Sequence, residues 1–160
     1  MRAAVRPGDA EAQMAAPGRP ARTETGMLTD IEQRNLAAVQ RFIHEYQNKG
    51  DLDAFRELMH PEFVDHSRPP HVALGPEGVR QQFDAFRSVL TGFQADVVLQ
   101  VAQDDLVSTH KVFSGIHTGA FLGIAPSGER VELSVSDTVR LRDGRIIEHW
   151  GVLNIAPLLR

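Results

Sequence analysis

The segment from Val131 to Leu141, VELSVSDTVRL, alternates between apolar and polar residues along nearly its whole length. A period of two is typical of a β-strand that turns one face toward the core and the other toward water. Asp137 is the exception, because it occupies the apolar register with Val135 and Val139. The pattern therefore predicts a carboxylate that points into the core or into a cavity within it. A buried carboxylate must be paired or have a raised pKa, and in the second case it can act as an acid or a base near neutral pH.

Three other structures would also place an aspartate at this point of the pattern. They are a strand end, a β-bulge and an aspartate hydrogen-bonded to nearby backbone. The hairpin that follows, Asp143-Gly144, predicts what Asp137 faces, because this dipeptide favours a two-residue turn. With such a turn Asp137 lies opposite Trp150, and a one-residue bulge would bring His149 there instead. An indole would desolvate the carboxylate, whereas an imidazolium would pair with it.

Length and composition restrict the class of protein. The chain has 160 residues, 42% apolar and 24% charged, as expected for one globular domain. Its formal net charge is -4 without a basic run, so nucleic acid and anionic membranes are poor candidates as partners. There is no cysteine, which leaves the redox compartment open. No apolar stretch is long enough to span a membrane and there is no signal-peptide core, so we expect a cytoplasmic protein. Residues 1–26, rich in Ala, Pro, Gly and Arg, are expected to be a disordered extension before a domain at 27–160.

The order of periodic segments predicts an α+β fold. Three helical segments come first, and the period then changes from three or four residues to two. The second half reads as four long strands in an antiparallel meander, and a short extended piece lies near Phe63. We expect a cone-shaped, curved sheet of about four long strands plus a short one, with the three helices covering one face.

The candidate site residues besides Asp137 are histidines and one tryptophan. His66 lies where a helix gives way to a strand, and His117 ends a strand between Gly115 and Gly119, where backbone can approach a ligand closely. None of the seven histidines has a recognised metal-ligand spacing, and no glycine-rich nucleotide loop is present, so we predict no metal and no cofactor. One interior carboxylate with nearby imidazoles and an indole suits proton transfer next to a carbonyl group.

Six motifs, taken in order, resemble the SnoaL-like polyketide cyclases, also called ester cyclases. The resemblance runs from about Asn35 to the C-terminus. As an ordered set the motifs are specific, although each alone would be weak. They are NKGDLD at 48–53, PEFVDH at 61–66, GPEG at 75–78, HTGAFLG at 117–123, PSG at 126–128 and DGRIIEHW at 143–150.

The resemblance implies the cystatin-like, nuclear transport factor 2-like fold and an intramolecular aldol ring closure of a polyketide ester without cofactor or metal. It implies that Asp137 is the single acid/base residue. His117 and His66 would then donate hydrogen bonds to the enolate, and Trp150, with His149 near it, would shape an apolar pocket. His66 falls near the position of a catalytic carboxylate in isomerase-like relatives, whereas Asp65, by strand alternation, should point elsewhere.

The same scaffold also carries isomerases, epoxide hydrolases, cofactor-free hydroxylases and plain ligand-binding proteins. An isomerase, hydratase or hydroxylase of a hydrophobic small molecule, or a non-catalytic binding module, therefore remains an alternative. Relatives associate through the open face of the sheet, and the strand at Phe93 has apolar residues beyond those that the core needs. We accordingly expect a homodimer or homotetramer.

Overall fold

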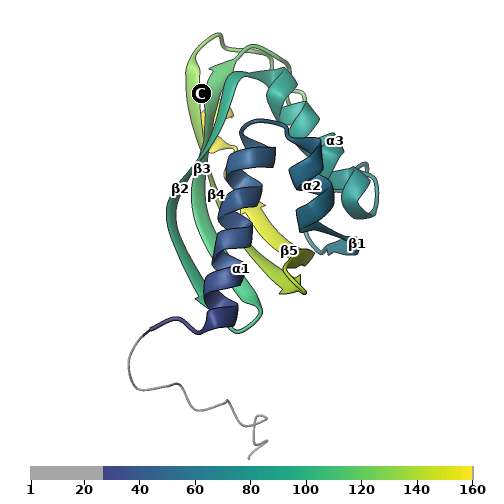
Figure 1. Ribbon diagram of the computed structural model, residues 1–160. Coiled ribbons are helices and arrows are strands. Elements are labelled where there is room, and N and C mark those ends of the chain that lie inside the picture. The colour runs from purple at the N-terminus through teal and green to yellow at the C-terminus, as the bar shows by residue number, and fades with distance from the viewer. Residues whose placement is uncertain (1–26, 160) are drawn as a thin grey trace, which may run out of the picture.

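The computed structural model describes residues 27–159, and the predicted disordered extension at 1–26 lies outside the described residues. Three helices and one short strand precede four long strands, and the five strands form one sheet, as the sequence predicted (Figure 1). The elements are α1 (Asp30–Arg41), η1 (Phe42–Gln47), α2 (Leu52–Leu58), β1 (Met59–Asp65), α3 (Gly75–Val89), β2 (Leu90–Gln103), β3 (Leu106–His117), β4 (Arg130–Arg142), β5 (Arg145–Leu153) and η2 (Ala156–Leu159).

Local signals in the sequence explain where the helices begin. Thr29 and Glu32 form a capping box at the start of α1, in which Glu32 Oε2 accepts from the Thr29 backbone N–H at 2.8 Å. Asp51 caps α2 by accepting from the backbone N–H groups of Asp53 and Ala54. Pro76 lies in the first turn of α3, where its missing N–H costs nothing.

The sheet has the strand order β1-β5-β4-β3-β2. The four long strands β2 to β5 pair antiparallel, whereas β1 pairs parallel to β5, so the sheet is mixed rather than wholly antiparallel. Helix α3 and three strands separate β1 from β5 along the chain, so no tight turn forces the two strands to run in opposite directions. This parallel pairing brings Asp65 beside His149.

The hairpin between β4 and β5 has the predicted two-residue turn. Asp143 and Gly144 both have positive φ, 51° and 75°, and Arg142 pairs with Arg145. The register then shifts, because Leu141 pairs with Ile146 but the residue before it pairs with Glu148. The additional residue is Ile147, which lies on β5 and not in the turn, and its side chain is buried.

Because of the bulge on β5, neither of the two residues predicted to lie directly opposite Asp137 does so. The residue opposite Asp137 is Gly151, whereas Trp150 lies opposite Thr138 and His149 lies opposite Val139. Since side chains alternate along a strand, His149 and Gly151 face the same side as Asp137, and Trp150 faces the other side.

The helices lie against the concave side of the curved sheet, and the core fills the space between these two layers (Figure 1). Phe83 of α3, Phe93 of β2 and Phe113 of β3 lie with ring centroids 5.1 to 6.2 Å apart within this core. Residues Val135 and Val139 of β4 belong to the same cluster. Asp137, between them, therefore faces the helices. Among residues 27–159, no helix is long and apolar enough to cross a membrane.

Candidate active site

Asp137 lies on the helix-facing side of β4, where the alternation of the sequence places it. Only 9% of the residue is exposed. Neither a strand end nor a bulge on β4 accounts for it, because β4 continues to Arg142 and pairs with β3 in unbroken register from Leu106 to Ile116. The fold therefore holds a carboxylate within the apolar register of a central strand.

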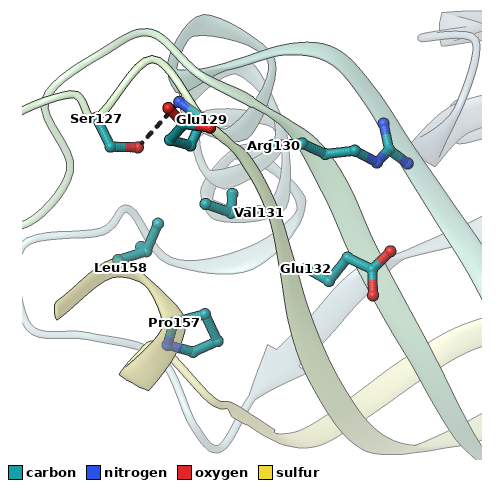
Figure 2. A pocket seen from close by; sticks show the side chains of 7 residues that line it. All are labelled: Ser127, Glu129, Arg130, Val131, Glu132, Pro157 and Leu158. Atoms are coloured by element: carbon teal, nitrogen blue, oxygen red, sulfur yellow. Dashed lines mark hydrogen bonds between the residues drawn. The ribbon is translucent and has the colours of Figure 1, made fainter. Parts of the chain in front are cut away.

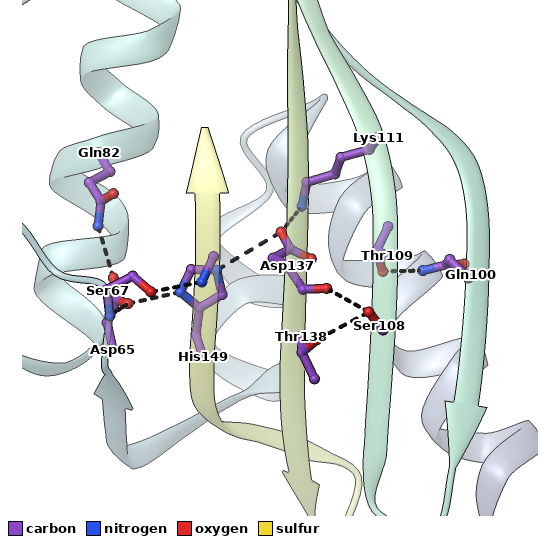
Figure 3. Close-up of polar contacts among 11 residues, drawn as sticks. Asp65, Ser67, Gln82, Gln100, Ser108, Thr109, Lys111, Asp137, Thr138 and His149 are labelled. Carbon is purple, nitrogen blue, oxygen red and sulfur yellow. Dashed lines mark hydrogen bonds and ion pairs between the residues drawn. The ribbon is translucent and has the colours of Figure 1, made fainter. Parts of the chain in front are cut away.

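The carboxylate of Asp137 is paired with a buried lysine that sequence reasoning missed. The Nζ atom of Lys111, on the neighbouring strand β3, lies 2.6 Å from Asp137 Oδ2 (Figure 3). Lys111 is 2% exposed and lies 5.4 Å from the centroid of the Phe113 ring. Lysine is seldom buried this completely without a partner. The signal was present in the sequence, because Lys111 occupies the same register as Val107 and Phe113 along β3.

His149 approaches Asp137 from the other side. Its Nε2 atom lies 3.9 Å from Asp137 Oδ2, and its Nδ1 atom lies 2.8 Å from Asp65 Oδ1. A carboxylate can only accept, so Nδ1 carries a proton and donates it to Asp65. In the neutral ring, Nε2 then has a free lone pair on the side of Asp137. Figure 3 shows Asp65, His149, Asp137 and Lys111 in one row across β1, β5, β4 and β3.

Asp65 is held at the end of β1 by several donors. Besides His149, the backbone N–H of Ser67 donates to it at 2.9 Å and Gln82 Nε2 donates at 3.4 Å (Figure 3). Burial by itself would raise the pKa of Asp65. The hydrogen bond from His149, together with the charge that this ring carries when it is protonated and with the other two donors, outweighs burial, and the pKa lies below its usual range.

The expectation that Asp65 points away from the site while His66 points toward it is wrong. The parallel pairing of β1 with β5 sets Asp65 beside His149 and turns the next residue outward. The His66 ring instead stacks on Trp150, with centroids 4.6 Å apart and planes at 5°, and its Nε2 lies 3.4 Å from Glu148. Trp150 is 36% exposed. Neither ring is brought to Asp137, because both lie on the other side of β5.

His117 does not border Asp137 either. The residue opposite Asp137 on β3 is Thr109, eight residues before His117, which corresponds to about 25 Å along a strand. His117 is 1% exposed, and its Nδ1 lies 3.4 Å from the backbone nitrogen and from the hydroxyl oxygen of Ser127. Within the described chain its Nε2 has no hydrogen-bond partner. Its predicted part as a donor at Asp137 does not fit this geometry.

A surface hollow of about 530 Å³ lies at the far end of β4, next to η2 (Figure 2). It is lined by Ser127, Glu129, Arg130, Val131, Glu132, Pro157 and Leu158. Val131 is six residues from Asp137, about 20 Å along the strand, so this hollow is separate from the row of charged residues. Over residues 27–159, no group of three or more His, Asp or Glu side chains is arranged to hold a metal ion.

The fold and the comparisons with known proteins define the class of protein. Three helices followed by a five-stranded mixed sheet form the α+β fold of the nuclear transport factor 2-like proteins. The model of the SnoaL-like polyketide cyclase family matches residues 37–160, and the chain belongs to this family. Among curated proteins, none matches the chain significantly.

Solved structures include several similar chains. IdmH, a candidate polyketide cyclase from Streptomyces antibioticus, is 30% identical, with a TM-score of 0.69 over 78% of this chain and 95% of that one. AclR, a candidate hydroxylase from Streptomyces galilaeus, is 25% identical, with a TM-score of 0.69 over 80% and 83%. A candidate SnoaL-like cyclase from Jannaschia is 24% identical, with a TM-score of 0.73 over 83% and 94%, and supports the fold.

Proposed function

We propose that the protein catalyses an aldol-type ring closure of a polyketide or a related carbonyl ester, with Asp137 as the acid/base residue. The observation that carries this proposal is the buried ion pair between Asp137 and Lys111, with Nζ and Oδ2 2.6 Å apart. An ion pair favours the ionised carboxylate, which is the form that accepts a proton, and here it lies between the buried Val135 and Val139 of β4. Membership of the cyclase family supports the same chemistry.

The reaction begins at a carbon between two carbonyl groups, because such a carbon is acidic enough for a carboxylate to deprotonate. Asp137 takes the proton, and the electron pair of the C–H bond becomes an enolate. The enolate carbon then attacks a second carbonyl carbon of the same molecule, which forms the ring C–C bond and leaves an alkoxide. The alkoxide is protonated to give the product, so the ring closure requires no oxidant or reductant.

Lys111 would stabilise the negative charge that the substrate gains. When Asp137 becomes neutral, the ammonium group loses its counter-charge and the enolate oxygen can take that place. Over residues 27–159, Asp137 is the one polar partner of the Lys111 ammonium, which has three N–H donors. A preformed donor in a buried site is worth more than one in water, and loss of such a donor typically lowers kcat by about 10² to 10³.

The substrate must reach Asp137 past His149. The Asp137 side chain is 9% exposed, whereas that of His149 is 27% exposed. Carbonyl compounds that are planar and largely apolar suit the surrounding core residues such as Val135 and Val139. No charged group beyond the row itself is needed for this binding.

The test is proton exchange at carbon in heavy water. We expect the protein to accelerate deuterium uptake into one or more of a panel of β-keto esters and aryl ketones, and Asp137→Asn to abolish the acceleration. Asp96→Asn, which makes the same change at an exposed position of β2, is the matched control and should retain it. Because Asp137→Asn leaves Lys111 buried without its partner, a variant that also carries Lys111→Met tests the same loss in a chain without the stranded charge. Exchange that survives in both variants would refute the role of Asp137.

Hydroxylation or hydration is the second candidate, since AclR is described as a hydroxylase candidate and shares 25% identity. An ionised carboxylate next to an imidazole could also take a proton from a water that adds to the substrate, or from a carbon whose carbanion then reacts with O2 to give a hydroperoxide. Incorporation of ¹⁸O from labelled water or labelled oxygen into the product would favour this candidate. A ring closure adds no new oxygen.

A further inference from the structure

The ring closure ends with a proton transfer to the new alkoxide, and a single acid/base residue would leave this step to Asp137 as well. Asp137 holds the proton from carbon at that moment, but it is buried and lies at the carbon that has reacted. The alkoxide forms on a different carbon of the substrate. A second group that can take the proton and move it outward would complete the reaction.

The structure assigns this step to His149: we propose that His149, positioned by Asp65, carries the proton from Asp137 to the alkoxide oxygen. This inference rests on the proposed function. The proton moves from carbon to Asp137, from Asp137 to the Nε2 lone pair of His149, and from Nε2 to the alkoxide. Each step breaks one bond to hydrogen and forms another, so His149 and Asp137 return to their starting forms.

The hydrogen-bond pattern prepares His149 for this role. Asp65 Oδ1 accepts from Nδ1 at 2.8 Å, which fixes the ring and leaves Nε2 as the atom that faces Asp137. Gln82 and the Ser67 backbone in turn hold Asp65. A base that is oriented by a third group in this way is a recurring arrangement in proton-transfer sites. Asp65 is a positioning residue, because it acts through His149 rather than on the substrate.

Charge supports the same order of steps. Lys111 contributes one positive charge, and Asp65 and Asp137 contribute two negative charges, so the row has a formal charge of -1 with neutral His149. The proton from the substrate brings the row to zero, at the moment when the substrate becomes an anion. An imidazolium between two carboxylates is then electrostatically favoured as the intermediate carrier.

Gly151 makes room for the ring. A Cβ atom at position 151 would lie 2.8 Å from both Cε1 and Nε2 of His149 and 3.3 Å from the Asp137 Cβ. A side chain there would therefore push the imidazole away from the carboxylate. With glycine at position 151, the His149 ring can lie across β5. Its Nε2 atom is 3.9 Å from Asp137 Oδ2, about 1 Å more than the usual length of a hydrogen bond. A small tilt of the ring closes that gap once Asp137 carries a proton to donate.

The probe for the test is methyl 3,7-dioxooctanoate, in which C2 lies between two carbonyls and can bond to C7. The product is methyl 2-hydroxy-2-methyl-6-oxocyclohexane-1-carboxylate. The rate of closure is measured with the ordinary probe and with freshly prepared C2-dideuterated probe. In His149→Gln we expect closure to fall by at least about 100-fold. The C2 isotope effect should fall toward one, because proton delivery rather than C–H cleavage then limits the rate.

His44→Gln is the matched control, since it makes the same change at an exposed position of η1, and it should close the probe at the wild-type rate. Closure by His149→Gln within about threefold of the wild type would overturn the proposal, and so would a large isotope effect that persists in this variant. Failure of the proposed function gives a different result: closure would then be insensitive to Asp137→Asn.

Two measurements test the positioning directly. When the His149 ring is neutral, its ¹⁵N shifts should show a proton on Nδ1 and none on Nε2. Asp65→Asn should lower kcat with little change in KM. Gly151→Ala should lower kcat in the same manner while the thermal unfolding stays cooperative. A proton on Nε2 of neutral His149, or wild-type turnover by Gly151→Ala, would contradict the arrangement.

Discussion

The ion pair between Lys111 and Asp137 gives the sharpest prediction for stability. At 2.6 Å the attraction between two unit charges is about 6 kcal/mol for an effective dielectric constant near 20. The cost of removing both groups from water offsets much of this attraction, so the pair itself adds little. Removal of one partner is different, because the remaining charge stays buried without compensation. We expect Lys111→Met, which keeps most of the side-chain volume, to lower the free energy of unfolding by about 3 to 5 kcal/mol.

The assay is chemical denaturation at neutral pH of the wild type, Lys111→Met, Asp137→Asn and the double variant. The double variant should be more stable than the sum of the two single losses predicts, because it buries no isolated charge. Glu57→Gln is a useful control: Glu57 pairs with Arg41 at 2.7 Å, nearly the same distance, but the side chains of Arg41 and Glu57 are 39% and 60% exposed. Glu57→Gln should lower the free energy of unfolding much less than Lys111→Met does. If Lys111→Met were no more destabilising than Glu57→Gln, the claim of a buried, uncompensated charge would be refuted.

Three further predictions follow from other contacts. The pKa of Asp65 lies below its usual range, so Asp65 contributes fully to stability above its pKa in the unfolded chain, about 4. This contribution is lost as the pH falls through the pKa in the folded protein. Asp65→Asn should remove this part of the pH dependence of the free energy of unfolding, measured by denaturation from pH 2 to 6. Val152 is 74% exposed on the open face of the sheet, which is turned away from the helices, and we propose that this face forms a homodimer. Val152→Glu should then yield monomers in sedimentation experiments at micromolar concentration, and a wild-type monomer would count against this face. Thr29→Ala removes the N-cap of α1 and should cost about 1 kcal/mol by calorimetry; an unchanged midpoint would show that the cap adds nothing.

The alternation of residues in single strands determined much of the fold. The strand around Asp137, the hairpin at Asp143-Gly144 and the switch from helices to strands all depend on neighbours in the sequence. Such local patterns fix which face a residue occupies, because side chains alternate along a strand whatever the rest of the chain does. The inward position of Asp137 was therefore predictable. The burial of Lys111 was predictable in the same way, since it shares a register with Val107 and Phe113.

The neighbours of Asp137 were decided by tertiary structure. One additional residue on β5 shifted the pairing from Trp150 to Gly151, and no turn signal marks that bulge. The parallel pairing of β1 with β5 joins segments more than eighty residues apart and brings Asp65, rather than His66, to His149. The sequence by itself thus determined that the chain has an interior carboxylate. Which charged groups surround it depended on strand pairing between distant segments, because register and strand direction are set by how whole elements pack and not by the residues beside each position.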